Sequence, residues 1–151
     1  KSVPISHDGP RGAFSDLPSF PDHWAVTEEA TQKHPFRLAT SPARNFLNSS
    51  FTETPTSRTK EQRPTVMVHP DDAGDAGFTE GALVTLGNAR GSVRLHAKLF
   101  AGVKRGVLIC EGIWPNHTFV DGQGINVLTG ADSCAPFGGA AFHDNSVWLR
   151  G

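Results

Sequence analysis

The residues with the most varied chemistry lie together in one segment, residues 36–51, with the sequence FRLATSPARNFLNSSF. Its largely apolar start, residues 36–39, predicts a strand. The side chains that follow are short hydrogen-bonding groups and one fixed positive charge: Thr40, Ser41, Arg44, Asn45, Asn48, Ser49 and Ser50. A loop of this composition at a strand end can hold a polar, anionic ligand that carries a ring.

Each residue of this loop also has a purely structural interpretation. Arg44 could bind a phosphate, or it could be a solvated surface side chain. Asn48 and Ser49 could bond to a heterocycle or a pyrophosphate, or they could form turns that satisfy only their own backbone. Phe46 and Phe51 could pack on a ligand ring, or they could anchor the loop in the core.

Two later segments offer further contacts. Trp114 follows an apolar run and could line a pocket with its indole N–H available, although a half-buried packing role also fits. Asn126 and Thr129 lie between Gly124 and Gly130, where the backbone could approach a ligand closely. An ordinary turn is the alternative for these two residues.

No catalytic or metal-binding motif is complete in this chain. The seven histidines form no HxH or HxxxH pair, and Cys110 and Cys134 lack CxxC spacing. We expect Cys110 to be a buried apolar residue and Cys134 to lie in a loop. Dinucleotide-binding, P-loop and GxSxG motifs are absent from the sequence.

Composition excludes several other classes. The net charge of −1 provides no electrostatic footprint for nucleic acid or an anionic membrane. No apolar run approaches the ~20 residues that span a bilayer. The chain starts without Met and without a signal peptide, so we expect an excised piece of a longer, soluble and cytoplasmic protein, with any targeting signal outside it.

The 16 glycines and 11 prolines favour short strands and turns over long helices. We predict an extended lead-in over residues 1–34 and a globular domain over 35–151. Within that domain we expect a helix at 70–76 and a hairpin turn at 88–91. The predicted strands include an alternating one at 93–99 and a fully buried one at 107–110; the others are 65–68, 82–87 and 146–149. This pattern indicates a small β-barrel or sandwich.

Four segments in order carry a resemblance to a known family: LATSPARNFLNSSF, TVMVHPDDAGDAGFTEGALVTLGNARGSVRLHAKL, GVLICEGIWPNH and GINVLTG. Together they resemble the C-terminal molybdopterin-dinucleotide-binding domain of the oxidoreductase family that includes dimethyl sulfoxide reductase and formate dehydrogenase. The resemblance covers residues 35–149. It implies a mainly β fold, a six-stranded double-psi β-barrel with one or two short helices and an irregular N-terminal lead-in.

The resemblance also implies a cofactor, bis(molybdopterin guanine dinucleotide) with molybdenum or tungsten, held mainly by other domains of the parent oxidoreductase. By position, the contacts in this chain would come from Thr40, Ser41, Arg44, Asn48, Ser49, Trp114, Asn126 and Thr129. The metal ligand and any iron–sulfur cluster would belong to the other domains. The isolated domain is therefore expected to be inactive and to serve only in gripping the cofactor.

Two alternatives use the same barrel. One is a protein-interaction module, which predicts an exposed apolar patch. The other is a pyruvoyl-type decarboxylase that matures by cleavage between Gly91 and Ser92. The second rests on a dipeptide that is commonplace in hairpin turns.

Overall fold

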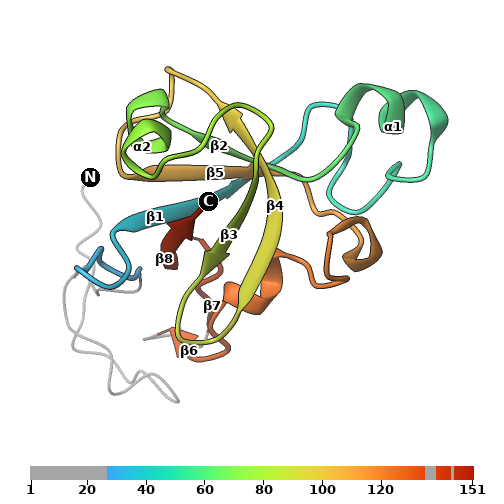
Figure 1. The fold of residues 1–151 in the computed structure, drawn as a ribbon. Coiled ribbons are helices and arrows are strands. Elements are labelled where there is room, and N and C mark those ends of the chain that lie inside the picture. Colours follow the sequence, from blue (N-terminus) through green and yellow to red (C-terminus); the bar gives the residue numbers. More distant parts are fainter. Residues whose placement is uncertain (1–26, 135–138, 144) are drawn as a thin grey trace, which may run out of the picture.

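Six strands form a closed barrel in the computed structural model, which describes residues 27–134, 139–143 and 145–151 (Figure 1). Around the barrel the order is β1-β5-β2-β4-β3-β8. The strands are β1 (Phe36–Ser41), β2 (Thr65–Val68), β3 (Leu83–Gly87), β4 (Ser92–Leu99), β5 (Val107–Glu111) and β8 (Asn145–Arg150). A two-stranded sheet pairs β6 (Ser133–Cys134) with β7 (Gly139–Ala140). The closed barrel confirms the predicted fold class.

Two of the six barrel pairings are parallel, β1 with β5 and β2 with β4, and the others are antiparallel. Parallel neighbours cannot be joined by a tight turn, so the chain crosses the barrel end to reach each of them. Because β1 and β5 run the same way, their carboxyl ends meet at one end of the barrel. The loops that leave these two strands therefore lie together.

Alternating side chains fill the barrel. In β4 the apolar Val93, Leu95 and Ala97 are buried, while Arg94 and Lys98 are exposed, as the sequence pattern predicts. The prediction of a fully buried strand at 107–110 is wrong in detail, because only Leu108 and Cys110 of that run point into the core. A barrel strand has one inward face, so its outward apolar residues stay partly exposed.

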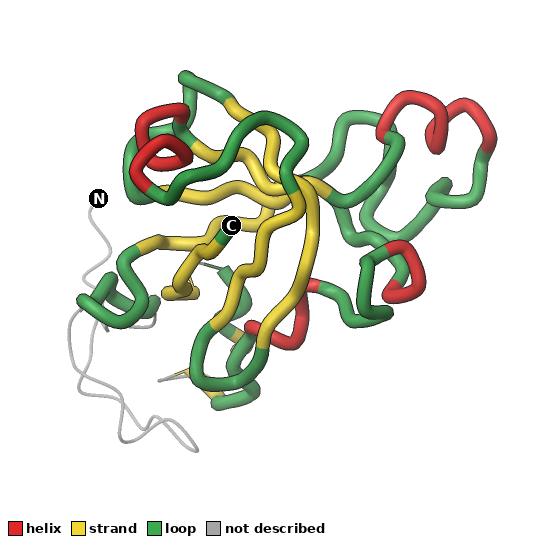
Figure 2. Tube along the Cα trace, viewed as in Figure 1, coloured by secondary structure: helices red, strands yellow, loops and turns green. Residues whose placement is uncertain are grey.

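Short helices lie outside the barrel (Figure 2). Helix α2 (Pro70–Asp75) confirms the predicted helix, and Gly77 follows it with a φ of 78°. Helix α1 (Pro55–Glu61) was not predicted, because it buries no side chain and has no apolar face to detect. The 3-10 turns are η2 (Asn116–Thr118) and η3 (Ile125–Leu128). Among the residues described, no helix is long and apolar enough to cross a bilayer.

Glu28 fastens the end of the predicted lead-in to the barrel. Its carboxylate accepts hydrogen bonds from the Ser146 backbone N–H at 2.7 Å and from the Arg90 guanidinium. Burial alone would raise the pKa of Glu28, but the bonds from Ser146 and Arg90 outweigh that effect, so the pKa lies below its ordinary value. The rest of the predicted lead-in, residues 1–26, lies outside the described residues. The boundary at residue 34 stays a prediction.

Glu28 makes stability depend on pH. A depressed folded-state pKa gives stabilisation that is present above the unfolded-state pKa and lost as pH falls through the folded value. The free energy of unfolding should therefore fall on acidification below about pH 4. Glu28→Gln should reduce part of that fall, as measured by urea titrations at a series of pH values. Equal pH dependence in both proteins would contradict the assignment.

Cys110 should be chemically inert in the folded chain. Burial raises the pKa of its thiol to about 12, so almost no thiolate forms near neutral pH. In a Cys134→Ser variant, which leaves one thiol, a disulfide reagent at about pH 8 should label nothing until denaturant is added. Rapid labelling of the native variant would show that Cys110 is not a core residue.

Candidate functional site

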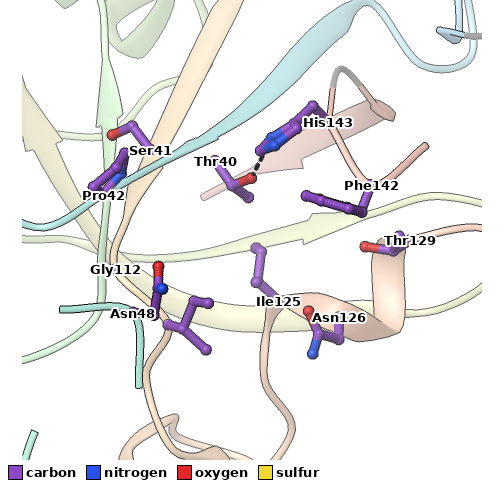
Figure 3. A pocket seen from close by; sticks show the side chains of 11 residues that line it. Thr40, Ser41, Pro42, Asn48, Gly112, Ile125, Asn126, Thr129, Phe142 and His143 are labelled. Carbon is purple, nitrogen blue, oxygen red and sulfur yellow. Dashed lines mark hydrogen bonds between the residues drawn. The ribbon is translucent and has the colours of Figure 1, made fainter. Parts of the chain in front are cut away.

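An open cavity of about 210 Å³ lies where β1 and β5 end (Figure 3). Segments that are distant in sequence meet in its wall: the end of β1 and its loop, the exit of β5, the η3 turn and the segment before β8. The lining residues are Thr40, Ser41, Pro42, Asn48, Gly112, Ile113, Ile125, Asn126, Thr129, Phe142 and His143.

The first wall comes from the parallel pair. Strand β1 continues two residues further than predicted, because Thr40 pairs with Cys110 and Ser41 with Glu111. The N–H of Gly112 then donates to the Ser41 carbonyl oxygen at 2.8 Å. On the same wall, Thr40 Oγ1 lies 2.8 Å from His143 Nδ1, a hydrogen bond that Figure 3 marks. Thr40 and Ser41 are thus fixed by strand pairing rather than by a mobile loop.

The second wall is η3. Leu128 is fully buried and anchors this turn in the core, while Ile125, Asn126 and Thr129 line the cavity. The Thr129 N–H donates to the Asn126 carbonyl at 3.1 Å, which closes the turn. The side-chain amide and hydroxyl at these two positions are consequently not needed to hold the turn together.

The cavity combines apolar surface with hydrogen-bonding groups of Thr, Ser, Asn and His side chains. Ile113 and Phe142 are 51% and 52% exposed, and the rings of Phe142 and His143 are 4.5 Å apart. Among the described residues, no Lys, Arg, Asp or Glu lines it. In the part of the chain that the structure describes, no group of three or more His, Cys, Asp or Glu side chains could hold a metal. These walls suit a neutral, polar ring system better than a phosphate or a metal ion.

Five of the eight predicted site residues come together here: Thr40, Ser41, Asn48, Asn126 and Thr129. Arg44 and Ser49 are exposed and do not line the cavity. Trp114 does not line it either, and its N–H is not free, because Nε1 donates to the Glu111 carbonyl at 3.0 Å. Trp114 instead borders a separate cleft of about 320 Å³ with charged walls.

Some polar groups of the loop after β1 form hydrogen bonds with other parts of the chain and do not face the cavity. The backbone and side-chain N–H groups of Asn45 both donate to Glu61 Oε1, at 2.8 and 2.7 Å. Phe46 is buried and meets Trp114 edge to face, with ring centroids 4.7 Å apart. For Asn45 and Phe46 the structural interpretation therefore holds. Phe51, in contrast, is 57% exposed and adopts a φ of 68°.

Sequence reasoning missed the cavity residues Gly112, Ile113, Ile125, Phe142 and His143. Gly112 and Ile113 come directly after β5. They could have been predicted as site residues only if the pairing of β5 with β1 had been predicted first. Phe142 and His143 precede the last strand and carry no motif. Only the closed topology brings them beside Thr40.

Gly112 should tolerate no side chain. It has a φ of 81°, and an added Cβ would lie 2.9 Å from Ala43 Cβ. Gly106 is a matched control, because its φ of 77° is similar but an added Cβ meets nothing within 4 Å. Gly106→Ala should cost about 1–2 kcal/mol from backbone strain alone. Gly112→Ala should cost clearly more in urea unfolding, and equal losses would contradict the close contact.

Residues 36–147 match the family model described as "Molydopterin dinucleotide binding domain". A probable oxidoreductase, YoaE of Bacillus subtilis, is 31% identical over 138 residues, which is 89% of this chain and 19% of that protein. A biotin sulfoxide reductase of Cereibacter sphaeroides is 31% identical, over 80% of this chain and 16% of that protein.

A putative catalytic chain of dimethyl sulfoxide reductase from Halobacterium salinarum is 29% identical, over 83% of this chain and 14% of its own length. Among solved structures, acetylene hydratase from Pelobacter acetylenicus matches 79% of this chain and 18% of its own, with a TM-score of 0.67 and 15% identity. The chain thus spans less than a fifth of the length of each of these relatives.

Proposed function

The chain belongs to the family of molybdopterin dinucleotide-binding domains, and from this premise we propose that its cavity holds part of that cofactor. The observation that carries the proposal is the convergence of Thr40, Ser41, Asn48, Asn126 and Thr129 on one cavity. These residues were predicted as contacts from the family resemblance, and they come from two segments far apart in sequence, residues 40–48 and 126–129.

The cavity fits one ring system and not a whole dinucleotide. Pockets that enclose a drug-sized ligand measure about 300–1,000 Å³, whereas this one has about 210 Å³. Hydroxyls and amides can bond to the nitrogen and oxygen atoms at the edge of a pterin, and the apolar surfaces of Ile125 and Phe142 can cover its face. We therefore assign the cavity to a pterin ring.

The charged parts of the cofactor would lie outside the cavity. The described lining carries no Lys or Arg, so phosphate contacts fall to exposed groups such as Arg44 and Ser49 on the neighbouring loop. Arg44, Ser49 and Trp114 do not line the cavity, so any contact from them would be with parts of the cofactor outside it.

We further propose that the chain is one domain of a larger oxidoreductase. Three relatives are named as oxidoreductases or reductases, and each is more than five times longer than the region matched. The other domains would hold most of a bis(molybdopterin guanine dinucleotide), its molybdenum or tungsten and any iron–sulfur cluster. When bound, the cofactor supplies the redox chemistry, and this chain orients its pterin and limits access of water. The cytoplasmic location expected from the sequence stays a prediction.

The family match favours this function over the two alternatives. Gly91 and Ser92 lie at the β3–β4 hairpin, where Ser92 pairs with Gly87 as an ordinary strand residue. The interaction-module alternative predicts an exposed apolar patch. The exposed Ile113 and Phe142 line the cavity itself, where a ligand ring would cover them.

Binding can be tested on the chain itself with 6-hydroxymethylpterin as the probe. At 16.2 kDa, the chain suits two-dimensional amide NMR. We expect the probe to shift the amide signals of residues 40–41, 112–113 and 125–129. Asn126→Ala should weaken binding roughly fivefold, the loss of about one hydrogen bond. Gln123→Ala, an exposed amide outside the cavity, should leave it unchanged.

Shifts centred on the charged cleft beside Trp114 would contradict the assignment, as would no shift at saturating probe. A parallel measurement on the parent enzyme is its pterin content per polypeptide. The Asn126→Ala enzyme should retain less pterin than the Gln123→Ala enzyme.

A further inference from the structure

One side chain outside the cavity is tied to two of its walls. Arg90 lies in the β3–β4 hairpin turn, beside η3 and the start of β8. Its Nε donates to the Leu128 carbonyl at 2.8 Å, and its Nη2 donates to Asn145 Oδ1 at 3.3 Å. The same Nη2 pairs with Glu28. Arg90 does not line the cavity.

The bond to Leu128 fixes η3. Leu128 lies between Asn126 and Thr129 in sequence, and these two residues are the polar groups of the second wall. Its carbonyl oxygen receives a second hydrogen bond from Asn88 Nδ2, also at 2.8 Å. Both donors come from the hairpin turn, so the hairpin holds η3 by two side-chain hydrogen bonds to one carbonyl oxygen.

The bond to Asn145 reaches the remaining wall. Asn145 is 3% exposed, and its Nδ2 donates to the Phe142 carbonyl at 3.3 Å. A two-step chain of hydrogen bonds thus runs from Arg90 to the segment that carries Phe142 and His143. Glu28 completes the arrangement by bonding to both Arg90 and Ser146.

Arginine suits this task because its planar guanidinium donates in several fixed directions at once. A lysine at this position would keep the charge and could satisfy Glu28, but it could not reproduce the fork that reaches Leu128 and Asn145. Substitution of Arg90 by lysine therefore separates the effect of its charge from the effect of its guanidinium geometry.

On the basis of the proposed function, we infer that Arg90 is a positioning residue for the pterin cavity. It sets the separation between the β1 wall and the two walls formed by η3 and the segment before β8. The fold itself does not depend on Arg90. Leu128 is fully buried in the core, and Ile125 and Val127 pack against that core, so η3 stays attached to the barrel without the guanidinium.

The test compares Arg90→Lys and Arg90→Ala with Arg105→Ala in the 151-residue chain. Arg105 is the matched control, because it also bridges segments through ion pairs, to Asp72 and Asp75, but near the opposite end of β4. Two quantities are measured: affinity for 6-hydroxymethylpterin, and amide hydrogen exchange in residues 126–129 and 145–146. Urea unfolding gives the stability of each variant.

We expect both Arg90 variants to weaken pterin binding about tenfold and to speed exchange at 126–129, with Lys restoring little. Arg105→Ala should lower stability without either effect. Unchanged affinity despite faster exchange would overturn the inference, as would unchanged exchange. If the unsubstituted chain binds no pterin, the proposed function fails, and the exchange comparison alone decides whether Arg90 sets the wall.

Discussion

The parallel pairing of β1 with β5 is the constraint on which the rest of the structure depends. It forces the polar loop after Ser41 and the Gly112–Trp114 exit to leave the barrel at the same end, although some 70 residues separate them in sequence. A parallel neighbour cannot be reached by a hairpin, so long connections must cross that end. Those connections supply the walls of the cavity. The site is therefore a consequence of closing this barrel, whose buried core cluster is apolar in the part of the chain that the structure describes.

Closing the barrel also determines which parts of the site are rigid. Thr40 and Ser41 belong to a paired strand, so their positions follow from the core. The η3 turn and the segment before β8 lie outside the barrel strands, and side chains outside the cavity must place them. Arg90, Asn88 and Asn145 do this through hydrogen bonds to carbonyl oxygens. Such bonds are directional, whereas apolar packing is not. A small set of polar residues can therefore fix the shape of a cavity more closely than apolar packing alone.

Local pattern was sufficient for most elements, because periodicity, turn residues and caps act within a few positions of the chain. It predicted α2, the β3–β4 hairpin, the alternation of β4 and the closing strand. It missed α1, whose polar sequence carries no periodic signal. The residues of the site were harder to predict than the strands and helices. Family resemblance predicted five residues that line the cavity: Thr40, Ser41, Asn48, Asn126 and Thr129. Neither resemblance nor pattern showed that the Trp114 N–H donates to the Glu111 carbonyl, or that Arg44 lies outside the cavity. Ile113 and His143 become site residues only through contacts between distant segments, which no local pattern records.

The distribution of charge limits what this domain can contribute. The cavity offers apolar surface and the donors and acceptors of Thr, Ser, Asn and His side chains, while Arg44, the cation of the neighbouring loop, lies outside it. Without a Lys or Arg among its described lining residues, the cavity offers no fixed positive charge to a phosphate. What it can do is recognise the edge of a ring and shield one face from water. In the proposed function this is a positioning role. Another part of a larger site would supply the metal ligand and cover the opposite face of the ring. Under the proposed function, this chain recognises and positions a pterin ring, while other domains would hold the rest of the cofactor and the metal ligand.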